Sequence, residues 1–146
     1  MKPAISEHTI RRRVQFYETD AAGIVHFSWY VRYMEEAEHA LWREAGMSIA
    51  PAGAAIGWPR VAIGFEFYRP LRFEEEFDVT IRVTAIRERR IEYACVLDRG
   101  ETRLASGTMT IACIARGPDG TMKATAIPRE VAGRLAVSAV PAGEAL

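Results

Sequence analysis

Cysteine and long apolar runs are both scarce in this sequence. Cys95 and Cys113 are the only two cysteines among 146 residues, and each lies in an apolar, strand-like stretch. Neither has a CxxC partner or a histidine at metal-ligand spacing, so we expect buried free thiols in a reducing compartment and no metal site. No run approaches the ~20 apolar residues that span a bilayer, and the first ten residues lack the apolar core of a signal peptide. These absences predict a cytoplasmic protein with no membrane partner.

Lysine is nearly absent as well. Among nineteen basic residues only Lys2 and Lys123 are lysines, the others are arginines, and nineteen acidic residues bring the net charge to zero. Arginine suits phosphate and carboxylate ligands, although a GC-rich genome would give the same bias. The run Arg11-Arg12-Arg13 could be a nucleic-acid patch. We favour a strand with Arg12 on its apolar face, because a basic binding surface usually carries more charge. No nucleic-acid partner is expected.

A long amphipathic helix is predicted at about residues 28–45, after a strand at 9–17. Its apolar positions recur at spacings of three and four residues and form one stripe: Tyr30, Tyr33, Met34, Ala37, Leu41 and Ala45. The polar side carries Arg32, Glu35, Glu36, Glu38, His39 and Arg43. Ser28 can cap the start of the helix, and Gly46 stands where a left-handed stop is wanted.

Beyond a loop rich in alanine, glycine and proline, the apolar period changes from helical spacing to alternation. Alternating positions predict long strands joined by short turns, hence an antiparallel meander. The runs lie at about 61–67, 77–83, 91–97 and 102–115.

The end of the chain carries weaker signals. A short helix is predicted near 129–135, and 136–146 reads as a frayed tail. The sequence has no repeat and no second set of elements, so residues 1–146 are predicted to form a single domain with its core at about 9–135.

The order of these elements predicts an α+β fold with a five-stranded antiparallel sheet wrapped around one long helix. One helix covers one face of such a sheet. Some apolar residues of these strands stand at the positions between the other apolar ones and should therefore point to the opposite face of the sheet: Val96, Met109 and Ile111. They predict an apolar outer face too large for a soluble monomer to expose. We therefore expect self-association as a dimer or tetramer.

The segment YETDAAGIVHFSWY at residues 17–30 resembles the signature of the hotdog-fold acyl-CoA thioesterases of the 4-hydroxybenzoyl-CoA thioesterase type. The resemblance extends through the strand order, Arg69-Pro70 and Ile127-Pro128, and covers about residues 9–135. It implies a hotdog fold and hydrolysis of an acyl-CoA thioester to free acid and CoA. No cofactor is implied, because the CoA thioester is the substrate. In this family, sheets of two subunits join edge to edge, and the active site is shared between them.

Thioester hydrolysis needs a carboxylate to attack or to activate water, and dipoles aimed at the carbonyl oxygen. Asp20 lies in the turn before the helix and could be only a turn former; the spacing to Gly23 and the family signature favour catalysis. The resemblance assigns the polarising dipole to the backbone amide of Phe27, at a helix start where N–H groups lack intrahelical partners. Gly23 would allow a tight turn between carboxylate and helix.

His26 and a hairpin of arginines are further candidates. His26 stands at a position that is commonly aromatic in the family; it could line the acyl pocket or orient water, or be a packed or surface imidazole. Arg87, Arg89 and Arg90 lie in the turn between two predicted strands. The last two match an Arg-Arg pair that contacts the CoA nucleotide in the family; the alternative is a polar hairpin tip that is kept soluble by its charge.

Two alternatives stay open, and a third is disfavoured. An acyl carrier protein could replace CoA as the thiol carrier, and a non-catalytic acyl-binding protein could share the fold. A hydratase of the same fold would be expected to show Asp-x-Asn-Pro-x-His, whereas the step from Asp20 to His26 contains neither Asn nor Pro. The identity of the acyl group does not follow from these residues.

Overall fold

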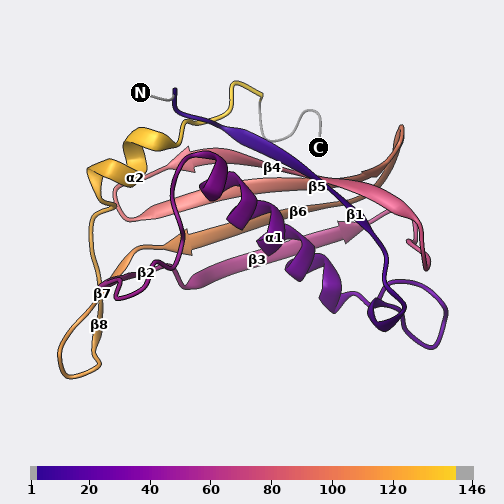
Figure 1. Cartoon of the computed structure of the whole chain (residues 1–146), viewed down its shortest axis with the longest axis horizontal. Helices are drawn as coiled ribbons and strands as arrows, with labels where there is room; N and C mark the ends of the chain where they lie inside the picture. The colour runs from indigo at the N-terminus through magenta and orange to yellow at the C-terminus, as the bar shows by residue number, and fades with distance from the viewer. Residues whose placement is uncertain (1–2, 141–146) are drawn as a thin grey trace.

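The computed structural model describes residues 3–140, and the last six residues of the predicted tail lie outside this range. Its eleven elements follow one another with short connections, apart from the segments 14–27 and 45–55 (Figure 1). They are β1 Glu7–Arg13, the 3₁₀ turn η1 Phe16–Glu18, α1 Ser28–Glu44, β2 Ile56–Gly57, β3 Arg60–Phe67, β4 Glu76–Ile86, β5 Arg90–Arg99, β6 Thr102–Ala112, β7 Ile114–Arg116, β8 Met122–Ala124 and α2 Arg129–Arg134.

The main sheet is antiparallel and has five strands, as predicted, but the expected meander is wrong in part. The strand order is β1-β4-β5-β6-β3. Only β4, β5 and β6 follow one another as hairpins, whereas β3 pairs with β6 and lies at the far edge from β4. The segment 68–75 crosses the sheet to join β3 to β4, so two strands adjacent in sequence are not adjacent in space.

Three predicted boundaries also need correction. The first strand ends at Arg13, and residues 16–18 form a 3₁₀ turn. The predicted strand at 102–115 is divided, because Ile114 starts β7 of a second, three-stranded sheet with the order β2-β7-β8. The tail remains attached at its start, where Ala136 and Ser138 donate backbone hydrogen bonds to Ile5 and Val83.

Helix α1 lies across the concave face of the main sheet and encloses the core with it (Figure 1). Its predicted apolar stripe is buried, and Gly46 takes the left-handed conformation (φ 81°) that stops the helix. Glu38 was predicted on the polar side of the helix, but it is fully buried. Arg60 of β3 reaches it with a 2.5 Å ion pair, and this pairing makes the burial of a carboxylate tolerable.

The predicted apolar outer face of the sheet is not found. Met109 and Ile111 belong to the core under the helix. On the outer face, Val96 stands opposite the polar residues Thr80 and Ser106 and is itself only 2% exposed. The sheet therefore does not need a partner over this face.

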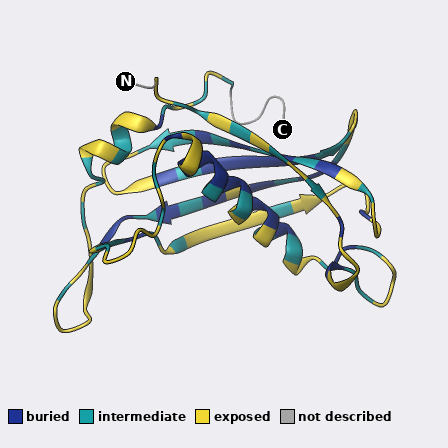
Figure 2. Cartoon of the chain, in the orientation of Figure 1, coloured by how far each residue is buried: buried dark blue, intermediate teal, exposed yellow. Residues whose placement is uncertain are grey.

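The uncovered apolar surface lies instead along β3, an edge strand of the main sheet. Ile63 is 43% exposed and Phe67 is 52% exposed, although both point to the same side of the sheet as the core. Helix α1 packs mainly against β1 and β4 and leaves this edge open. In Figure 2 the exposed stretch of β3 runs beside the buried central strands.

Candidate active site

Asp20 lies in a tight turn between η1 and α1. The Gly23 N–H donates to the Asp20 carbonyl at 3.0 Å, and Gly23 has a φ of 81°, which favours glycine. The carboxylate oxygen Oδ1 accepts the Ala22 N–H at 2.8 Å and the Ile24 N–H at 3.5 Å. The second oxygen, Oδ2, has no donor within the described part of the chain. Asp20 is thus a turn former through one oxygen, and its other oxygen is left available for chemistry.

Phe27 directly precedes α1 and has helical dihedral angles (φ −55°, ψ −29°). Its carbonyl accepts the Tyr30 N–H at 3.3 Å, but no atom of residues 3–140 accepts its own N–H. An unpaired N–H at a helix start carries partial positive charge. Phe27 therefore supplies a backbone donor of the kind that stabilises an oxyanion.

The contacts of the His26 ring within the described part of the chain are with Ser28 and Phe27 and do not include the Asp20 carboxylate. Its Nδ1 accepts the Ser28 N–H at 3.2 Å and lies 2.8 Å from the Ser28 hydroxyl, and its ring stacks on Phe27 with centroids 4.4 Å apart. Ser28 was predicted to cap α1; instead it is the first residue of the helix, and the imidazole accepts its N–H. The structure brings His26 next to the Phe27 ring but forms no Asp20–His26 pair.

A groove of about 480 Å³ contains both Asp20 and Phe27. Its other walls come from the segment before α1, from the first turn of α1, and from the end of β3 with the residues after it: Ile24, Val25, Tyr30, Phe67, Tyr68, Arg69 and Pro70. The rings of Tyr30 and Phe67 meet edge to face with centroids 4.8 Å apart. The groove can hold an apolar group against these rings and present its polar end to the carboxylate.

The Tyr68–Pro70 part of this wall was not identified from the sequence as part of the site. These residues are about fifty positions from Asp20, and only the topology brings the two segments together. Arg69-Pro70 was noticed as part of the family resemblance, which is the one sequence signal that pointed here.

A buried carboxylate is hydrogen-bonded close to the turn that contains Asp20. Glu18 is fully buried, and its side chain accepts hydrogen bonds from Arg12 at 2.7 Å, Tyr33 at 2.9 Å and the backbone of Gln15 at 2.8 Å. Burial alone would lower the pKa of Arg12, but its hydrogen bonds to Glu36 and Glu18 outweigh this effect and raise the pKa. Burial, and then the bond to Glu18, raise the pKa of the Tyr33 hydroxyl.

The arginine run of β1 is not a free basic patch. Arg11 is paired with Asp78, Arg13 with Glu76, and Arg12 with Glu18 and Glu36. The favoured interpretation of this run as a strand with Arg12 facing inward is confirmed.

The arginines of the β4–β5 hairpin lie far from Asp20 within one chain. Arg13 lies seven residues before Asp20 and is paired with Glu76, the first residue of β4. Arg87 directly follows Ile86, the last residue of β4, and so lies at the other end of this strand. The eleven residues of β4 separate these ends by roughly 33 Å. Arg87 forms an ion pair with Glu92 at 2.5 Å, while Arg89 and Arg90 are exposed and have no carboxylate partner within residues 3–140.

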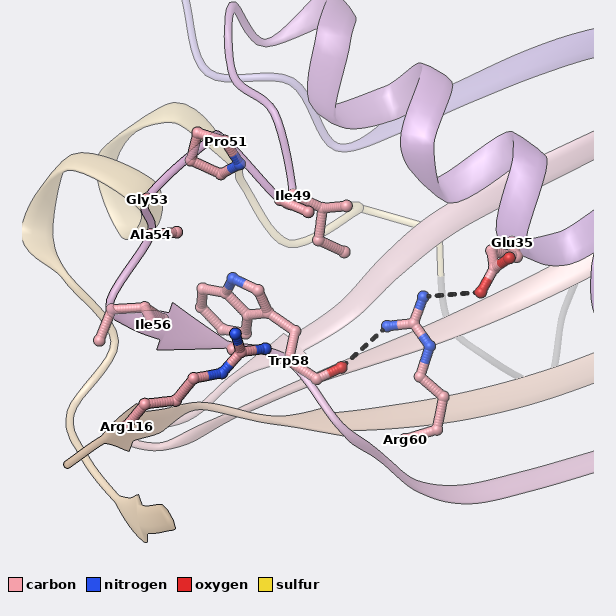
Figure 3. A pocket seen from close by; sticks show the side chains of 11 residues that line it. Glu35, Ile49, Pro51, Gly53, Ala54, Ile56, Trp58, Arg60 and Arg116 are labelled. Carbon is pink, nitrogen blue, oxygen red and sulfur yellow. Dashed lines mark hydrogen bonds and ion pairs between the residues drawn. The ribbon is translucent and has the colours of Figure 1, made fainter. Parts of the chain in front are cut away.

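A second pocket, of about 440 Å³, lies at the beginning of β3 (Figure 3). Trp58 and Ile49 line it together with the guanidinium of Arg116, and Arg60 bridges Glu35 and the Trp58 carbonyl at its margin. The groove with Asp20 and this pocket lie at opposite ends of the same edge strand.

Within the described residues, no helix is long and apolar enough to cross a membrane, and no three histidine, cysteine, aspartate or glutamate side chains gather as metal ligands. Cys95 and Cys113 are buried free thiols, as predicted. Burial raises the pKa of Cys95 to about 12, so neither its environment nor its ionisation suits a nucleophile.

Comparison with known proteins identifies the family of this chain and proteins of similar fold. Residues 14–135 match the family model described as the thioesterase-like superfamily. A crystal structure of an Aquifex aeolicus protein superposes with a TM-score of 0.82 at 28% identity, covering 88% of this chain and 99% of the other. A gentisyl-coenzyme A thioesterase structure superposes with a TM-score of 0.77 at 25% identity, covering 86% and 99%. A 1,4-dihydroxy-2-naphthoyl-CoA hydrolase of Crocosphaera subtropica is 28% identical over 58% of this chain and 63% of its own length. The predicted hotdog thioesterase fold is confirmed.

Proposed function

Since the chain belongs to the thioesterase-like superfamily and has its fold, we propose that it is an acyl-CoA thioesterase in which Asp20 is the catalytic carboxylate. The observation that carries this proposal is the shared groove. One oxygen of Asp20 is bound in its turn and the other is not, and Phe27, whose N–H has no acceptor within residues 3–140, lines the same groove.

The chemistry follows from these two groups. A thioester carbonyl that accepts the Phe27 N–H becomes more electrophilic, and the oxyanion that forms on attack is stabilised by the same donor. Asp20 Oδ2 either attacks the carbonyl carbon or takes a proton from a water molecule that attacks it. In the first route the CoA thiolate leaves, and water then hydrolyses the acyl–aspartate anhydride. Both routes give a free acid and CoA, and neither needs a cofactor.

Two relatives support CoA as the carrier and point to an aromatic acyl group. One is named for gentisyl-CoA and the other for 1,4-dihydroxy-2-naphthoyl-CoA. In this chain Tyr30 and Phe67 offer ring faces to the acyl group inside the groove. An assignment to the 4-hydroxybenzoyl-CoA type is a finer proposal of the same kind.

We further propose that two subunits pair through β3 and share their sites. Antiparallel pairing of two β3 edges would cover Ile63 and Phe67 and continue the sheet. A two-fold axis through this pairing sets the beginning of β3 of one subunit beside the end of β3 of the other. The Trp58 pocket and the basic β4–β5 hairpin would then lie on the side of the partner subunit that faces the Asp20 groove, where Arg89 and Arg90 could bind the CoA phosphates.

A hydrolysis screen with free-thiol detection tests the proposal. Short, long, branched and aromatic acyl-CoA esters are compared with the same acyl groups on acyl carrier protein. We expect turnover of CoA esters, fastest with an aromatic acyl group. Turnover of only the carrier-protein esters would identify the alternative carrier, and binding without turnover of any thioester would identify a non-catalytic acyl-binding protein.

A further inference from the structure

Two buried glutamates have similar surroundings: Glu18 precedes α1, and Glu38 lies within it. Both are fully buried. Glu18 pairs with Arg12 and accepts the hydroxyl of Tyr33, and Glu38 pairs with Arg60 and contacts the hydroxyl of Tyr93. A buried ion pair of this kind contributes little net stability compared with an apolar replacement.

The Glu18 cluster is attached to every segment that forms the catalytic turn. The carboxylate ties η1 to β1 through Arg12 and to α1 through Tyr33. Its backbone carbonyl accepts the His26 N–H at 2.8 Å, one residue before Phe27. Glu18 itself stands two residues before Asp20. Glu18 therefore holds in place both backbone segments, the one that carries the proposed carboxylate and the one that carries the proposed oxyanion donor.

We infer that Glu18, held by Arg12 and Tyr33, is a positioning residue that sets the distance between the Asp20 carboxylate and the Phe27 N–H. This inference rests on the proposed function. Glu18 does not line the groove and is fully buried, so it acts through the backbone and not on the substrate. Small displacements of catalytic groups lower turnover strongly without changing substrate affinity to the same degree.

The Glu38 cluster provides the matched control. Tyr33→Phe and Tyr93→Phe each delete one buried tyrosine hydroxyl that contacts a buried glutamate, and neither ring is removed. Tyr93 also accepts the Trp42 indole N–H at 3.0 Å, and neither Tyr93 nor Trp42 lines the Asp20 groove. The Tyr33 hydroxyl donates a buried hydrogen bond to Glu18, and the Tyr93 hydroxyl accepts one from Trp42. Since each variant loses one of these bonds, the two should lower Tm by similar amounts.

The test compares kcat and KM for these variants and Glu18→Gln on the best acyl-CoA substrate of the wild type. Tyr33→Phe should lower kcat about tenfold and Glu18→Gln roughly 10²-fold, with KM within about twofold of the wild type. Tyr93→Phe should retain wild-type kcat. Equal kcat values in Tyr33→Phe and Tyr93→Phe would overturn the inference, as would wild-type kcat in a folded Glu18→Gln protein.

Amide hydrogen exchange gives a readout that needs no substrate. The His26 amide should exchange about tenfold faster in Tyr33→Phe than in the wild type, while Tyr93→Phe leaves it unchanged. Unchanged His26 exchange in both variants also overturns the inference. If the wild type hydrolyses no thioester, the proposed function fails, and the exchange experiment still decides whether Glu18 positions the turn.

Discussion

Replacement of Phe27 by proline tests the oxyanion donor, because proline removes the backbone N–H together with the ring, whereas Phe27→Ala removes the ring alone. Phe27 has a φ of −55°, within the range that the proline ring imposes. Its N–H has no acceptor in the described structure, so the substitution breaks no hydrogen bond of the fold. The Phe27 carbonyl, which accepts the Tyr30 N–H, is retained. Proline is also well tolerated where a helix begins.

The expected loss is that of one oxyanion donor, about 10²–10³ in kcat or roughly 3–4 kcal/mol of transition-state stabilisation. Phe27→Ala is the control: it deletes the ring, which is 69% exposed, and keeps the N–H. This control should raise KM modestly and hold kcat within a few-fold of the wild type. Steady-state hydrolysis with thiol detection measures both variants, and thermal unfolding checks their folds. A folded Phe27→Pro protein with the kcat of Phe27→Ala would refute the assignment.

Three further predictions concern binding, packing and pH. Replacing Arg89 and Arg90 with alanine should raise KM for acyl-CoA about tenfold or more at unchanged kcat. The same double variant should hydrolyse an N-acetylcysteamine thioester, which lacks the nucleotide, as the wild type does. An unchanged KM for acyl-CoA would show that the hairpin arginines only keep the protein soluble. Gly107→Ala should destabilise the fold by about 1–3 kcal/mol in urea unfolding, because its Cβ would stand 2.6 Å from the Phe65 ring; wild-type stability would contradict that packing. Burial raises the pKa of Glu38 above 4.5, so the folded state keeps a proton that the unfolded chain releases. The stability of the wild type relative to Glu38→Gln should therefore fall as pH rises from 4.5 through the folded-state pKa, and a difference independent of pH would show that the shift is absent.

Local sequence signals were sufficient for most of the elements and for the turn that brings the candidate site residues together. The apolar stripe of α1 and the alternation of the long strands each depend on one repeating spacing, and both are confirmed. Asp20, Gly23 and Phe27 lie within eight residues, so a turn followed by a helix start already places them together. The left-handed conformation of Gly23 agrees with its expected place in a tight turn.

Features that depend on partners distant in sequence were not predictable in the same way. The alternation of apolar residues shows that β3 is a strand, but it does not show that β3 pairs with β6. That pairing depends on segment 68–75, which crosses from β3 at one edge of the sheet to β4. The parity of Val96 suggested an apolar outer face because the small residues beside it on neighbouring strands could not be known. The burial of Glu38 likewise depends on Arg60, which comes from β3.

The most direct test of the central claim is the hydrolysis rate of Asp20→Asn. Asparagine keeps an oxygen that can accept the Ala22 N–H, as Oδ1 does now at 2.8 Å, but it loses the charge on the free oxygen. Asp119→Asn is a matched control, since Asp119 also accepts a backbone N–H two residues ahead, from Thr121 at 3.1 Å, and is exposed. We predict that Asp20→Asn lowers kcat by ~10²-fold or more with Tm and oligomeric state unchanged, while Asp119→Asn turns over as the wild type does. Near wild-type turnover by Asp20→Asn would contradict the account and place the catalytic carboxylate elsewhere.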